Sequence, residues 1–135
     1  MRKICLTVTL LLTIVFTAHS QNYLNKRKQY IMIAMAHDIK KYNVVVTQTD
    51  STVSFKMIGP LKPSEMIVHF DQYGRCDNEV IIDECEECYH ERINKLLKGT
   101  WTKVNNDKYI SKKYELITHY QNQPFAFQFS KVVLN

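Results

Sequence analysis

The sequence predicts an α+β domain, in which an antiparallel sheet of five to six strands is covered on one face by two helices. Two observations support this class. Apolar residues recur with a period near 3.6 in two segments and with a period of two in the others. The segments of period two are joined by short turns, not by crossover helices, so their strands should run antiparallel. The expected order is α-β-β-β(β)-α-β-β.

The first predicted helix spans residues 24–42. The lysines near its end lie away from its apolar stripe, so we expect the stripe to pack against the sheet. At helical spacing, this stripe consists of Leu24, Ile31, Met35, Ile39 and Tyr42.

From residue 43 the apolar period changes to two, which predicts successive antiparallel strands. Apolar and polar residues alternate in them, as in Val53, Phe55 and Met57. Gly74 ends a hairpin turn at 71–74, where glycine supplies a positive φ. The strands are expected around residues 44–48, 53–57, 66–70 and 80–82.

A second helix is predicted over residues 84–98. Asp83 is its expected N-cap, acidic residues occupy its first turn, and Gly99 follows its last lysines. Its buried stripe is expected to consist of Tyr89, Ile93, Leu96 and Leu97.

Two more strands are predicted after the second helix, at 114–120 and 125–133. A turn at 105–107 precedes them, and residues 121–124 join them. The alternation of three phenylalanines in the last strand indicates core residues. No internal repeat, linker or low-complexity tract is evident, so residues 21–135 should form one domain.

Residues 1–20 have the three parts of a cleavable secretory signal peptide. Arg2 and Lys3 give a positive start, residues 4–16 are an apolar run, and small residues precede a cut after Ser20. The apolar run is short of the roughly 20 residues that a membrane-spanning helix needs. We therefore expect a periplasmic or secreted protein with no membrane attachment after cleavage.

The charge and the motifs of the chain exclude some classes of function. The formal net charge of +5 includes two bases of the signal segment, and the remaining excess is spread along the chain. This pattern gives no reason to expect a nucleic-acid partner. No serine elbow, phosphate-binding glycine loop or paired-histidine metal helix is present in the sequence. We therefore expect no cofactor and no metal, and the sequence indicates no catalytic residue.

Several stretches of the second half resemble small exported proteins of Bacteroidetes-type bacteria. They are residues 68–71 (VHFD), 73–76 (YGRC), 96–97 (LL) and 125–127 (FAF), together with Tyr89 and Trp101. The resemblance implies a periplasmic or secreted setting and transfers no functional residue. The order of elements also resembles the secretion-chaperone-like fold and, more loosely, the cystatin-like and TATA-binding-protein-like folds.

Three cysteines, Cys76, Cys85 and Cys88, remain after the signal segment, and export would allow two of them to form a disulfide. Cys85 and Cys88 are close enough on the helix for a local bridge. Cys76 should lie roughly 20 Å from the helix start, beyond the roughly 7 Å that a bridge allows between Cα atoms. Free thiols, a redox pair and a metal site at Cys85 and Cys88 remain alternatives. The surrounding acids disfavour a thiolate, and zinc would need four ligands.

The sheet face opposite the helices is expected to be unusually apolar, and it is the predicted binding face. This leads to the first hypothesis, a small exported binding module that takes a protein partner or a second copy of itself through this face. The alternative hypothesis is a thiol- or metal-dependent activity at Cys85 and Cys88. If the apolar sheet face is not a binding surface, we expect loops or the protein's own C-terminus to cover it. The predicted face comprises Ile58, Ile67, His69, Ile81, Ile117 and His119.

Overall fold

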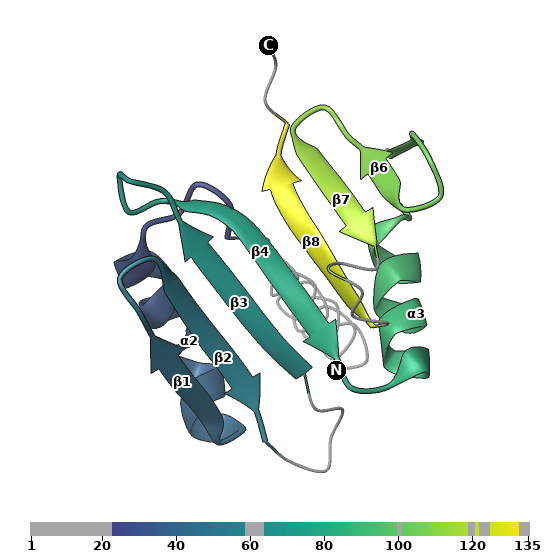
Figure 1. The fold of residues 1–135 in the computed structure, drawn as a ribbon. Helices are drawn as coiled ribbons and strands as arrows, with labels where there is room; N and C mark the ends of the chain where they lie inside the picture. Colours follow the sequence, from purple (N-terminus) through teal and green to yellow (C-terminus); the bar gives the residue numbers. More distant parts are fainter. Residues whose placement is uncertain (1–22, 59–63, 100, 119–120, 122–124, 133–135) are drawn as a thin grey trace, which may run out of the picture.

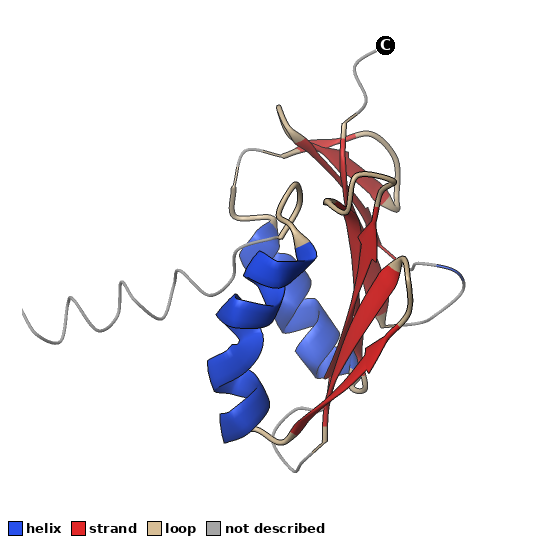
Figure 2. Cartoon of the chain, turned by 90° about the vertical axis from the view of Figure 1, so that its left-hand side faces the viewer, coloured by secondary structure: helices blue, strands red, loops and turns tan. Residues whose placement is uncertain are grey.

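The computed structural model describes residues 23–58, 64–99, 101–118, 121 and 125–132. In this part of the chain, one antiparallel sheet of eight strands is accompanied by two α-helices (Figure 1). Both helices lie on the same side of the sheet (Figure 2). The predicted α+β class with an antiparallel sheet is therefore confirmed. The signal peptide expected at 1–20 lies outside the described residues.

The predicted strand count of five to six was wrong. The two additional strands, β5 and β6, are only two and three residues long, too short to show a period of two in the sequence. The elements are α2 (Lys28–Lys41), β1 (Val44–Gln48), β2 (Thr52–Met57), β3 (Ser64–Phe70), β4 (Cys76–Asp83), α3 (Glu86–Leu96), β5 (Thr102–Lys103), β6 (Lys108–Ile110), β7 (Tyr114–Thr118) and β8 (Ala126–Lys131).

The order of strands in the sheet shows that the domain is built from two similar halves. The order is β1-β2-β3-β4-β8-β7-β6-β5, so each half is a helix followed by a four-stranded meander. The registers agree: Ile67 pairs with Val80 in the first half, and Ile117 pairs with Gln128 in the second. Val80 and Gln128 also pair with each other where the halves meet. An approximate two-fold axis therefore passes between these two residues.

A short sequence repeat accompanies this symmetry. Residues 65–70 read EMIVHF, and residues 115–120 read ELITHY. Phe55 pairs with Met66 as Tyr109 pairs with Leu116, so residues 65–68 of β3 and 115–118 of β7 occupy equivalent registers. The expectation that the chain has no repeat was wrong. The separation of equivalent positions is 54 residues between Phe55 and Tyr109 but 50 between Met66 and Leu116, so no single period is visible.

The core lies between the sheet and the two helices. Ile31 of α2 is fully buried, and Tyr89 and Ile93 of α3 are buried with it. Burying side chains of this size stabilises the fold by roughly 1.5–3 kcal/mol each. The sheet contributes the largest share of the cluster through Val44, Val53, Phe55, Val68, Phe70, Cys76, Leu116, Phe127 and Phe129.

Both helices begin later than the sequence predicted. Before α2, the chain pairs with the start of β4: the Asn25 N–H donates to the Cys76 carbonyl at 2.7 Å, and the Cys76 N–H donates to the Lys26 carbonyl at 2.8 Å. These bonds hold residues 25–26 outside the helix. At α3 the N-cap is Cys85, and the expected cap Asp83 is instead the last residue of β4.

Candidate functional site

A cavity of about 310 Å³ lies between the sheet and the two helices. Its size is at the lower end of the range for small-molecule pockets. Most of its lining is apolar, and both halves of the domain contribute to it. Examples of this lining are Met35 from α2, Leu96 from α3, Trp101 after α3, and Phe55, Ile81 and Phe127 from the sheet.

One side chain in this cavity is a carboxylic acid on the helix-facing side of the sheet. Glu79 in β4 is only 3% exposed. A register shift where β3 meets β4 places buried Cys76 opposite Phe70, and exposed Asp77 is left outside the pairing. The alternation of β4 therefore continues with Glu79 and Ile81 toward the helices. This shift explains why an acid occupies a core position.

The environment of Glu79 favours its protonated form. Its carboxyl group accepts a hydrogen bond from the Tyr23 N–H. Burial raises the pKa of Glu79 to about 8, although a hydrogen bond from the Leu24 backbone acts in the opposite direction. At pH 7 this side chain is therefore mostly a neutral acid.

Asp38 is a second acid that lines the cavity, and it acts on Tyr23 together with Glu79. The pKa of Tyr23 is raised by burial and, to a smaller extent, by the nearby carboxyl groups of Glu79 and Asp38. The Tyr23 hydroxyl donates to the Met35 Sδ atom at 3.4 Å, which holds its ring against α2. Tyr23, Asp38 and Glu79 all line the cavity. Together they form a polar, acidic region on a mostly apolar surface.

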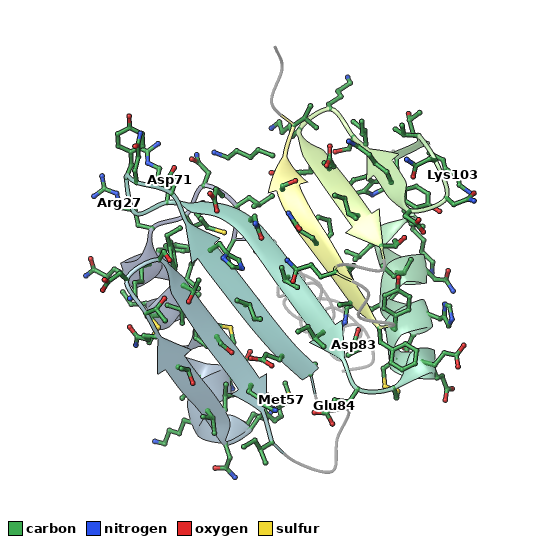
Figure 3. The ribbon with its side chains drawn as sticks, in the orientation of Figure 1. Arg27, Met57, Asp71, Asp83, Glu84 and Lys103 are labelled. Atoms are coloured by element: carbon green, nitrogen blue, oxygen red, sulfur yellow. A yellow bond between two sulfur atoms is a disulfide. The ribbon has the colours of Figure 1, made fainter. Side chains whose placement is uncertain are left out.

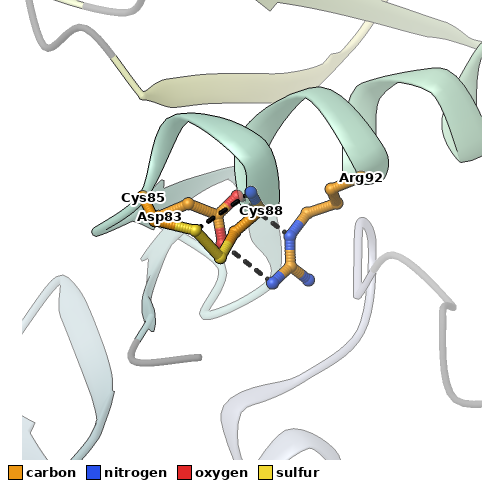
Figure 4. Close-up of a disulfide and its surroundings, with 4 residues drawn as sticks. All are labelled: Asp83, Cys85, Cys88 and Arg92. Carbon is orange, nitrogen blue, oxygen red and sulfur yellow. Dashed lines mark hydrogen bonds and ion pairs between the residues drawn. A yellow bond between two sulfur atoms is a disulfide. The ribbon is translucent and has the colours of Figure 1, made fainter. Parts of the chain in front are cut away.

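Arg92 also lines the cavity, and its guanidinium group is already paired. It donates from Nε to Asp83 Oδ2 at 3.1 Å and from its terminal Nη2 to Asp83 Oδ1 at 2.9 Å. The side chain of Asp83 is 1% exposed. Asp83 lies at the end of β4 beside α3, so this two-bonded pair fixes the helix to the sheet (Figure 3, Figure 4).

Cys85 and Cys88 lie at disulfide distance, with their Cα atoms 5.2 Å apart, as the prediction of a local bridge expected (Figure 4). Cys85 is also the N-cap of α3, where its Sγ accepts the Cys88 N–H at 3.0 Å. Cys76 is a free, buried thiol, and burial raises its pKa. A buried thiol with a raised pKa is a poor nucleophile.

The part of the chain that the structure describes contains no cluster of side chains arranged to bind a metal ion. No group of three or more His, Cys, Asp or Glu side chains there is placed to hold an ion. On the exposed surface of α3, His90 Nε2 lies 3.6 Å from Oε1 of Glu86, which is one helical turn away.

Replacing both Cys85 and Cys88 by serine is expected to lower the free energy of unfolding by about 2 kcal/mol, because the loop that the bridge closes is short. Urea denaturation of the oxidised protein and of the double variant measures this loss. Wild type under reducing conditions is the control and should match the variant. Equal stability of the oxidised wild type and the variant would contradict a stabilising bridge.

The structure separates the residues of the predicted binding face. Ile67, His69 and Ile117 alternate with core residues and point away from the helices. Ile58 follows β2 and is exposed. Ile81 was placed on this face by the sequence, but it packs against the core and lines the cavity. His119 lies outside the described residues.

The centre of the outer face includes Val80, which the sequence did not place there. Val80 pairs with Ile67 and with Gln128, and Ala126 pairs with Ile82. Val80 and Ala126 are only 1% and 0% exposed. The apolar area that this face presents is therefore smaller than its sequence suggests.

Glu79 and the cavity were missed by the sequence reasoning. Residues 80–82 are all apolar, so the run fits either phase of a strand, and placing Ile81 on the binding face put Glu79 on that face as well. The repeat of EMIVHF and ELITHY is the signal that could have corrected the choice. Its spacing of 50 residues is even, so it places Glu79 in the same phase as Phe127 and Phe129 of β8, which mark the inward side of that strand.

No protein-family model matches the chain, and no curated protein or solved structure shows significant similarity to it. Among the described residues, neither helix is long and apolar enough to cross a lipid bilayer. Any functional assignment therefore depends on the geometry of the cavity and of the groups around it.

Proposed function

We propose that this protein is an exported, non-enzymatic binding module that holds a small, largely apolar molecule between its sheet and its helices. The observation that supports this proposal is the cavity of about 310 Å³. The signal peptide predicted at 1–20 supports a periplasmic or secreted location.

The lining of the cavity supports a binding role. Ligand sites usually combine apolar walls with a few convergent polar groups. Displacing water from such apolar walls favours binding of an apolar ligand. Trp101 and Phe127 offer aromatic surface, and the Trp101 indole is held in place by a hydrogen bond to the Leu96 carbonyl at 2.9 Å. A fixed aromatic wall costs a ligand little reorganisation.

The other two candidate sites have weaker support. The outer sheet face lacks Ile81, and its central residues Val80 and Ala126 are buried. The Cys85–Cys88 pair lies among exposed acids, Glu86 and Glu87, which disfavour a thiolate. We therefore assign this pair a structural role at the start of α3.

Phenylbutanol, a neutral apolar probe, is expected to bind saturably and to change the fluorescence of Trp101, the one tryptophan of the chain. The variant Ile81→Phe should weaken this binding by about tenfold or more, because the larger side chain fills the cavity. Fluorescence titration measures both affinities, and circular dichroism checks that the variant is folded.

The matched control is Ile117→Phe, which makes the same substitution on the outer face of the sheet. It should leave the affinity for phenylbutanol within about twofold of wild type. The proposal fails if wild type shows no saturable binding. It also fails if Ile117→Phe, and not Ile81→Phe, abolishes the signal, because the probe would then bind to the outer face.

A further inference from the structure

The chemistry of the ligand follows from the acid in the cavity, and this inference rests on the proposed function. We propose that the cavity takes an organic cation, a small apolar molecule whose protonated amine is bound by the carboxyl group of Glu79. The apolar body of the molecule would lie against Trp101 and the phenylalanines of β8.

The internal symmetry of the domain indicates that the fold does not require an acid at this position. The two-fold axis passes between Val80 and Gln128, so the equivalent of Glu79 in the second half is Phe127. Both side chains face the helices and line the same cavity. One half thus places a large apolar side chain where the other half buries a carboxyl group. Burying an acid is costly, and the hydrogen bonds from the Tyr23 and Leu24 backbone offset only part of that cost, because burial still raises the pKa of Glu79. A ligand that brings a positive charge to Glu79 would offset more of it.

The charged groups around Glu79 favour a cation over an anion. Asp38 on α2 lies on the same side of the cavity as the Tyr23 hydroxyl. The carboxyl groups of Asp38 and Glu79 both raise the pKa of Tyr23. On α3, Arg92 is held by two hydrogen bonds to Asp83. On β4 itself, the thiol of Cys76 is buried and its pKa is raised.

The remaining acid in the lining does not change this balance. Glu65 contributes to the wall, but its carboxyl group accepts a hydrogen bond from the Ser54 hydroxyl. Phe127 and Phe129, which flank Glu79 on β8, carry no charge. An ammonium group beside Tyr23 therefore lies within electrostatic reach of the carboxyl groups of both Glu79 and Asp38, whereas a carboxylate ligand there would be repelled by Asp38.

Binding of an amine should release a proton from Glu79. Without ligand, burial keeps this acid protonated at pH 7, and an ammonium group nearby favours the carboxylate. The ammonium group enters with its own proton, the Glu79 proton leaves to solvent, and an ion pair remains. The affinity for an amine should therefore rise between about pH 6 and pH 8, whereas the affinity for a neutral analogue should stay constant.

Isothermal titration calorimetry of phenylbutylamine, phenylbutanol and phenylbutanoate tests this inference. At pH 8 we expect the amine to bind wild type about tenfold or more tightly than the alcohol, and the carboxylate to bind most weakly. The variant Glu79→Gln keeps an acceptor for the Tyr23 N–H and removes the charge. It should lose this preference for the amine, so that the amine and the alcohol bind the variant with affinities within about twofold of each other.

The outcomes separate the two proposals. If the alcohol binds but wild type shows no preference for the amine at pH 8, the amine inference is wrong and the cavity still binds apolar molecules. If none of the three probes binds, both proposals are wrong. Should Glu79→Gln fail to fold, the pH dependence of wild type decides: an amine-to-alcohol affinity ratio that does not rise from pH 6 to pH 8 overturns the inference.

Discussion

Replacing Glu79 by glutamine is expected to flatten the dependence of folding stability on pH. Burial raises the pKa of Glu79 to about 8 in the folded chain, against 4.5 without such an environment. Between these values the folded protein keeps a proton that the unfolded chain has lost, so wild type loses stability as the pH rises. The loss is about 1.4 kcal/mol for each pH unit of difference, or on the order of 3–5 kcal/mol in total.

Urea denaturation at pH 5 and at pH 8 measures this effect. Wild type should be several kcal/mol less stable at pH 8, whereas Glu79→Gln should change little. The measurements stop at pH 8 so that Cys76 does not contribute to the pH dependence. Its thiol has an ordinary pKa of 9.0 in the unfolded chain and stays mostly protonated at pH 8. The other titratable groups are common to both proteins, so their contributions cancel in the comparison.

A matched control is Glu115→Gln, which removes an acid at the outer face. Glu115 is partly exposed and pairs with Lys108 at 2.8 Å, so its removal should cost about 1 kcal/mol or less. The pH profile of this variant should run parallel to that of wild type. Parallel profiles for wild type and Glu79→Gln would contradict a buried, protonated Glu79.

Local patterns predicted the helices and the long strands, because each of these elements carries its own period in the sequence. α3 is an example: Tyr89 and Ile93 recur at helical spacing, and both are buried. The Cys85–Cys88 pair was predictable for the same reason, since two residues three positions apart are brought together by local geometry alone.

The features that the sequence did not reveal depend on pairings between distant segments. β5 and β6 are strands only because they extend the sheet beside β7. The phase of β4 depends on the register shift opposite Phe70, which moves Glu79 and Ile81 to the helix side. The cavity requires β4 and β8 to meet at the centre of the sheet, a contact with no local signature.

The ion pair beside the disulfide should be the other large contribution to stability. Arg92→Ala is expected to lower the free energy of unfolding by about 3 kcal/mol, because it leaves the buried carboxylate of Asp83 without its partner. The expected cost is at the lower end for such pairs, since the side chain of Arg92 is 42% exposed and water can partly replace it.

The neighbouring lysine provides the control for this prediction. Lys95 pairs with Glu91 at 2.8 Å on the exposed surface of the same helix, so Lys95→Ala should cost only about 0.3–0.5 kcal/mol. Urea denaturation of both variants and of the double variant Asp83→Ala/Arg92→Ala completes the comparison. The double variant should lose less than the sum of the two single changes, because no buried charge remains. Additive losses, or a cost for Arg92→Ala no larger than that for Lys95→Ala, would show that this pair does not hold α3 to the end of β4.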